Sequence, residues 1–187
     1  LPVECLEELD RAIHGDHVSS GNKQEWRFHQ LRGVVLLGSY ENADPKVVNP
    51  RGAEEAFLAM ARYAQGDSKK DAARAFLSAG WSAYVQSVEE PLKMADALQY
   101  TAKAVELDPN LAEAHFQKAK ILVSIGRLDE GLRTLRRAVD QDPRYLIKAA
   151  GDGEFQQHTA ELNDFLDSLR AEELQALQSQ VRAFLAE

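Results

Sequence analysis

The sequence predicts an all-α fold. About three antiparallel helical pairs would stack into an α-α superhelix, with an extra N-terminal helix and one or two C-terminal capping helices. Three observations predict this architecture. Residues of high helix propensity are abundant. Apolar residues recur every three or four positions rather than in strand-like alternation. The phrase AVELDPN at 104–110 returns as AVDQDPR at 138–144, and such a fixed period is typical of solenoids.

Apolar spacing and turn residues divide the chain up to Asp140 into seven expected helices. The expected ranges are Val3 to His14, Glu25 to Leu37, Ala53 to Tyr63, Lys70 to Val88, Pro91 to Glu106, Leu111 to Ser124, and Asp129 to Asp140. The longest irregular segment, Ser39 to Gly52, is rich in Gly, Asn, Asp and Pro.

Prolines and glycines set the expected helix boundaries. Pro91 is expected at the first position of its helix, where the missing N–H costs nothing. Asp108-Pro109 and Asp142-Pro143 are each expected to end a helix, because the residue before a proline is disfavoured in the α region. Gly15 is expected to close the first helix, and Asp152 to cap the helix that follows it.

The C-terminal segment has apolar residues at a spacing of three or four, with one step of five between Leu169 and Leu174. The pattern fits either one long helix with a stutter or two helices broken near Arg170. The half before Arg170 is expected to cap the open end of the superhelix. The half after it could continue the cap, or it could form a coiled coil that makes a homodimer.

The period of 34 residues resembles the tetratricopeptide repeat family, strongest over Ser78 to Tyr145. In the unit 112–145 the bulky, small and punctuating positions of the family pattern are filled by His115, Ala119, Leu122, Gly131, Leu135, Ala138 and Pro143. The unit 78–111 fits less closely, since Val85 stands where a small residue is usual and Leu92 where a turn glycine is usual.

The resemblance implies one helical domain over 1–187. Its parts would be an N-terminal helix and loop at 1–24, a divergent first repeat with an inserted loop at 25–67, a second repeat at 68–111, a third at 112–145, and capping or extension helices at 146–187. Repeats of this family generally bind other polypeptides, so the resemblance implies a protein-binding scaffold or adaptor without catalytic residues or a cofactor.

In this family the first helix of each pair lines a concave groove that holds a peptide. Carried onto this chain, that rule gives the expected groove residues Arg27, Gln30, Val34, Leu37, Ala79, Ser82, Gln86, Glu89, Glu113, Phe116, Lys120 and Val123. Some relatives clamp a terminal carboxylate with paired Lys and Asn residues, and Lys120 stands here without such an Asn. Replacing Lys120 or Gln86 is expected to weaken binding without unfolding.

Composition excludes several other function classes. The net charge of −8 disfavours general binding to nucleic acid or to anionic membranes. A single cysteine, Cys5, supports neither a disulfide framework nor a cysteine-based zinc site. The chain has no apolar run long enough for a membrane span. The opening LPVECLEELD has no initiator Met and no signal pattern, so we expect a piece of a longer protein. Low cysteine usage and the lack of a signal pattern predict a cytoplasmic location.

Two polar clusters are candidate sites. His14, Asp16 and His17, with His29 one helix away, could ligate a metal, but a helix C-terminus followed by a loop explains them better. Arg133, Arg136 and Arg137 could hold an acidic segment, but exposed cations near a helix end, partly paired with Glu130 or Asp140, explain them better. Two alternatives to the adaptor stay open: an assembly module that uses the C-terminal helix and the Ser39 to Gly52 loop, and a regulatory region of a larger enzyme.

Overall fold

In the computed structural model, which describes residues 2–15, 24–41 and 43–186, every regular element is a helix. The helices are α1 (Pro2–His14), α3 (Trp26–Leu37), α4 (Pro50–Ala64), α5 (Lys69–Gln86), α6 (Lys93–Leu107), α7 (Ala112–Ser124), α8 (Leu128–Gln141), α9 (Arg144–Gly151), α10 (Gly153–Gln156) and α11 (Thr159–Ala186). Among these described helices, none is long and apolar enough to cross a membrane.

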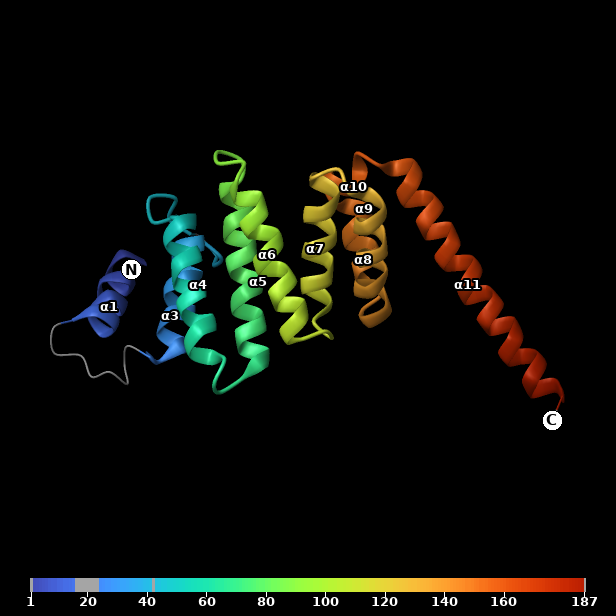
Figure 1. The fold of residues 1–187 in the computed structure, drawn as a ribbon, viewed down its shortest axis with the longest axis horizontal. Coiled ribbons are helices and arrows are strands. Elements are labelled where there is room, and N and C mark those ends of the chain that lie inside the picture. Colours follow the sequence, from blue (N-terminus) through green and yellow to red (C-terminus); the bar gives the residue numbers. More distant parts are fainter. Residues whose placement is uncertain (1, 16–23, 42, 187) are drawn as a thin grey trace.

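Helices α3 to α8 stand side by side in chain order and form three antiparallel pairs, α3/α4, α5/α6 and α7/α8 (Figure 1). Helix α1 packs on α3 at one end, while α9 and α10 pack against α7 and α8 at the other. This arrangement confirms the predicted all-α superhelix.

Small residues let the paired helices approach one another. Helix α5 buries Ala72, Ala75, Ala79 and Ala83 completely, and Ala97 and Ala104 of α6 are buried equally well. The predicted small position at Gly131 of α8 is tight, because a Cβ there would lie 2.6 Å from Cγ2 of Val123 and 3.1 Å from the carbonyl oxygen of Ala119. Close-packed interiors leave no room for such an atom, so α7 and α8 can adopt this separation only with glycine at 131.

The loop between α3 and α4 is anchored at both ends. Gly38 ends α3 in the left-handed conformation (φ 70°), and its N–H donates to the carbonyls of Val34 and Val35. Asn49 donates its backbone N–H to Leu36 O (2.7 Å), and its side chain accepts from Gly52 N at 3.0 Å, which caps α4. Helix α4 therefore begins at Pro50, three residues before the predicted start, with the proline in its first turn.

The sequence placed Pro91 at the first position of a helix, and this was wrong. Helix α5 ends at Gln86, and residues 87–92 form a turn that includes Pro91, so α6 begins at Lys93. Both Asp-Pro predictions were correct, since Asp108 and Asp142 are the C-terminal caps of α6 and α8, and their N–H groups donate to Ala104 O and Ala138 O.

Helix α11 runs without a break through Arg170 and Ala171, so the single-helix alternative holds. In its first half Leu162 and Leu169 are buried in a cluster with Leu135, Val139 and Phe155. In its second half five apolar residues are exposed by half or more: Leu174, Leu177, Val181, Phe184 and Leu185. The first half thus packs as the predicted cap, while the second half runs away from the stacked helices (Figure 1).

Candidate functional site

A hollow that we call the central cleft lies where α5 and α7 run side by side. Its volume is about 350 Å³, and its lining consists of Leu37, Ser39, Leu77, Ser78, Trp81, Glu113, Phe116, Gln117, Lys120, Lys148 and Asp152. Three first helices of the predicted pairs, α3, α5 and α7, thus contribute to it together with α9. A mixed apolar and polar lining of this size fits a few side chains of a partner.

Lys120 is fixed at one edge of the central cleft. Its Nζ donates to Oδ2 of Asp152 at 2.8 Å, and both side chains are less than one fifth exposed. The same ammonium lies 5.6 Å from the ring centroid of Trp81 and 5.5 Å from that of Tyr84. The two rings stack on each other at 5.3 Å, so one cation joins α7, the α5 rings and the start of α10.

The short helix α10 closes the cleft at this end. Its cap, Asp152, accepts from Glu154 N at 3.0 Å, as the sequence predicted. Glu154 accepts from the Tyr84 hydroxyl at 2.7 Å, although 70 residues separate them. Burial, and then this hydrogen bond, raise the pKa of Tyr84 above its ordinary value.

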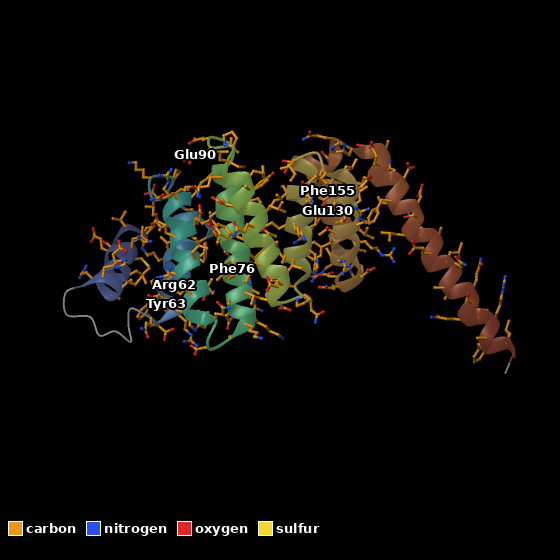
Figure 2. All side chains as sticks on the ribbon, in the orientation of Figure 1. Arg62, Tyr63, Phe76, Glu90, Glu130 and Phe155 are labelled. Atoms are coloured by element: carbon orange, nitrogen blue, oxygen red, sulfur yellow. The ribbon has the colours of Figure 1, made fainter. Side chains whose placement is uncertain are left out.

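An aromatic cluster joins the cleft to the C-terminal core, the buried cluster formed by residues of α7, α8, α9, α10 and α11. Phe155 is fully buried among the helices at the C-terminal end of the stack (Figure 2). Its ring lies 5.9 Å from that of Phe116, which in turn lies 5.1 Å from the ring of Tyr145. Phe116 therefore presents one part to the cleft and packs the other against residues that hold α9 and α10 in place.

On α7 the structure brings together the groove residues that the sequence predicted. Glu113, Phe116 and Lys120 all line the central cleft, with Glu113 exposed at its rim. Val123, the fourth predicted position, is buried in the C-terminal core instead. Gln117 was not predicted, and its side chain is held by Leu77 O (3.2 Å) and the Thr101 hydroxyl (3.0 Å).

On α5 the predicted positions do not face the cleft. Ser82 is fully buried and donates to Ser78 O at 2.9 Å. Gln86 donates to Glu54 Oε2 at 2.6 Å and to Ser82 O at 3.1 Å. Ala79 is fully buried as well. These side chains hold α5 against its neighbours, so replacing Gln86 would disturb packing as well as any binding.

The exposed residues of α5 come one position earlier than predicted. Ser78 and Trp81 line the cleft, and Val85 is 37% exposed on the next turn. The turns within the two pairs also differ in length. Residues 87–92 separate α5 from α6, whereas only 125–127 separate α7 from α8. The offset of 34 that relates the second helices, α6 and α8, thus does not relate the cleft-lining residues of α5 and α7.

Trp81, Val85 and Val88 form what we call the apolar ridge. Trp81 is 37% exposed and Val88, in the turn after α5, is 85% exposed. Val85 and Val88 also line a second hollow of about 440 Å³ beside Asn49, Pro50 and Arg51 of the α4 start. The ridge thus extends the central cleft toward the tip of the α5–α6 turn, where Arg51 and Glu90 form an ion pair at 2.7 Å.

On α3 some of the predicted groove residues line the central cleft and others do not. Arg27 and Gln30 are exposed but do not line the central cleft, and the Arg27 guanidinium contacts Glu25 and lies 4.4 Å from the Trp26 ring centroid. Leu37 lines the cleft from the last turn of α3. The α3 contribution therefore comes from the end of the helix and not from its first turn.

In the other two polar clusters, His29 and Arg136 contact neighbouring side chains. Asp16 and His17 lie outside the described residues. Among the described residues, no group of three or more His, Cys, Asp or Glu side chains could hold a metal ion. His29 is buried and stacks on Tyr63 at 5.3 Å. Arg136 forms ion pairs with Asp140 of α8 and Glu172 of α11, each at 2.7 Å, and so links α8 to α11 at the surface.

Comparison with known proteins supports the family resemblance over one segment. Residues 93–150, which span α6 to α9, match the tetratricopeptide repeat family, while no curated protein matches the chain. The match includes Glu113, Phe116 and Lys120 of the cleft and leaves Trp81 outside it. Residues 93–150 are therefore similar to tetratricopeptide repeats, which generally mediate protein–protein interaction.

Proposed function

We propose that this chain is a non-catalytic binding module that holds a polypeptide segment in the central cleft and along the apolar ridge. Tetratricopeptide repeats are typically interaction modules, and the match over residues 93–150 supports a protein-binding function. The main support for this site is Trp81, a large aromatic side chain that is 37% exposed and belongs to both the central cleft and the apolar ridge. Partly exposed aromatic residues beside a preformed hollow commonly anchor a binding partner.

The cleft offers such a segment several kinds of contact. Trp81, Leu77 and Phe116 supply apolar surface, and Lys148 and Glu113 stand exposed at the rim with opposite charge. Lys120 is already neutralised by Asp152, so its chief role is to hold the Trp81 and Tyr84 rings in place. An apolar side chain would therefore fill the cleft, and the rim charges would orient the backbone that carries it.

Two tryptophans in the chain make the proposal testable. A random peptide library displayed on phage would be selected against the chain, and the selected peptides synthesised. In a Trp26→Phe variant Trp81 is the sole tryptophan, and peptide addition should shift its emission to shorter wavelength. In the matched Trp81→Phe variant only Trp26 reports, and no shift is expected.

The same peptides should bind a Trp81→Ala variant about tenfold more weakly or worse, because the aromatic anchor is gone. Circular dichroism would verify that the variant is folded. Equal affinity for the chain and for Trp81→Ala, or an emission change confined to Trp26, would reject the central cleft as the site.

A further inference from the structure

The floor of the central cleft carries a hydrogen-bond acceptor that the surrounding residues do not use. Of the residues that line the cleft, Leu77 and Gln117 are the two buried ones, each 8% exposed, so they form its floor. The side-chain nitrogen of Gln117 donates to Leu77 O at 3.2 Å and to the Thr101 hydroxyl at 3.0 Å. These two bonds use both amide hydrogens, and no described residue donates to the Oε1 atom of Gln117.

The orientation of this amide is fixed by its neighbours. The carbonyl of Leu77 can only accept, so Nε2 of Gln117 must face it and Oε1 must point away from it. Gly80 leaves the space that the amide fills, because a Cβ there would lie 3.0 Å from Nε2 of Gln117. The Oε1 atom is accessible, since the unpartnered side-chain oxygen that the described part of the chain encloses completely is that of Gln86. Because Gln117 lines the central cleft, its Oε1 opens into the cleft.

A hydrogen-bond donor stands beside this acceptor. Ser78 lines the cleft and directly follows Leu77, whose carbonyl contacts the Gln117 amide. Among the described residues, Ser78 takes part in side-chain hydrogen bonds only through its backbone carbonyl, which accepts from the Ser82 hydroxyl at 2.9 Å. Its own hydroxyl can therefore donate to a group that enters the cleft. The lower part of the cleft thus offers one acceptor and one donor close together.

The walls above the floor are apolar and carry no excess charge. Leu37, Trp81 and Phe116 supply the apolar surface, and two of these side chains are aromatic. The charged lining residues are two cations and two carboxylates: Lys120, Lys148, Glu113 and Asp152. A hollow of about 350 Å³ with such a lining suits one large, uncharged side chain, and its aromatic walls suit a ring.

We propose that the polypeptide segment held in the central cleft inserts a tyrosine side chain, an inference that rests on the function proposed above. The tyrosine ring would lie between the apolar walls, and its hydroxyl would donate to Gln117 Oε1 and accept from the Ser78 hydroxyl. A hydroxyl can do both, whereas the indole of tryptophan only donates and phenylalanine does neither. Serine and threonine also end in a hydroxyl, but they lack a body large enough to fill the cleft.

The peptides selected against the chain supply the first test. They should share one tyrosine, and replacing it by phenylalanine should weaken binding about tenfold or more, because the Gln117 acceptor then loses its contact with water and gains no partner. Isothermal titration calorimetry with the two synthetic peptides measures this ratio of affinities. The comparison needs no altered protein, so it does not depend on the folding of a variant.

A second test locates the contact at the floor of the cleft. In a Gln117→Leu variant the tyrosine and phenylalanine peptides should differ by less than about twofold, because the acceptor is gone. The matched Gln30→Leu variant changes an exposed residue outside the cleft and should keep the full ratio. Ser78→Ala leaves the Gln117 amide in place and should lower the ratio in part. Since each ratio is measured within one variant, a general loss of stability does not alter it.

The outcomes separate this inference from the proposed function. Peptides that depend on Trp81 but contain no shared tyrosine, or that bind equally well with phenylalanine in its place, would overturn the tyrosine and leave the central cleft as the binding site. A full ratio retained in both Gln117→Leu and Ser78→Ala would overturn it as well. Peptides that bind without regard to Trp81 would reject the central cleft itself, and the tyrosine with it.

Discussion

The ammonium of Lys120 and the carboxylate of Asp152 meet at 2.8 Å, and this contact joins the cleft-lining helix α7 to the segment that closes the cleft. The pair is largely buried and also touches the faces of Trp81 and Tyr84. The lining of the cleft and the stability of the fold are therefore coupled at this point. The expectation that replacing Lys120 weakens binding without unfolding the chain stays a prediction.

Replacing Lys120 by Met should lower the free energy of unfolding by about 2 kcal/mol, because Asp152 is left as a largely buried charge without its partner. Asp152→Asn keeps the cap of α10 and should recover part of the loss in the double variant. Urea denaturation would measure both effects. A matched control is Arg170→Met, which breaks the exposed Arg170–Asp167 pair and should change little. Equal losses at Lys120 and Arg170 would contradict the prediction.

Stability should fall at alkaline pH in part through Tyr84. Burial and the hydrogen bond to Glu154 raise the pKa of Tyr84 in the folded chain. A raised folded pKa contributes stability that is present below the ordinary tyrosine pKa of about 10 and is lost as pH rises beyond it. Tyr84→Phe should therefore show a shallower loss of unfolding free energy above that pH.

Burial also raises the pKa values of Tyr100 and Tyr145, so the Tyr84→Phe variant should retain part of the alkaline decline. Urea denaturation of the chain and the variant at neutral and at alkaline pH provides the comparison. If the two curves stay parallel across the alkaline range, Tyr84 makes no such contribution.

Gly131→Ala should destabilise the α7/α8 pair by about 1–3 kcal/mol, even though alanine is the better helix former. The added methyl would meet a branched Val123 side chain and a backbone carbonyl, neither of which can move away easily. Thermal unfolding followed by circular dichroism would measure the change. Gly66→Ala serves as the control, since no atom lies within 4 Å of a Cβ there. An unchanged melting temperature for Gly131→Ala would show that the pair can relax.

The cap formed by the first half of α11 can be tested by a matched pair of Leu→Ala changes. Leu162 is 5% exposed and Leu92 is 90% exposed. Leu162→Ala should cost about 2–5 kcal/mol of unfolding free energy, because it leaves a cavity under α11, whereas Leu92→Ala should stay within about 0.5 kcal/mol. Similar values for the two variants would mean that α11 does not stabilise the solenoid.

The sequence by itself determined the helical class, the stacking of helical pairs and most helix ends. These features depend on local chemistry. Asp108-Pro109 and Asp142-Pro143 end helices because of backbone sterics, and the alanines of α5 and α6 are buried because closely packed helices require small side chains. The repeat boundaries inferred from the same pattern stay a prediction.

The tertiary structure alone decided which side chains line the cleft. On α7 the predicted Glu113, Phe116 and Lys120 line the cleft. On α5 the exposed face lies one residue earlier than predicted, so Trp81 and not Ser82 is at the surface. Contacts across long separations, such as Tyr84 with Glu154, have no local signal. They arise because α10 folds back onto helices that are close to it only in space.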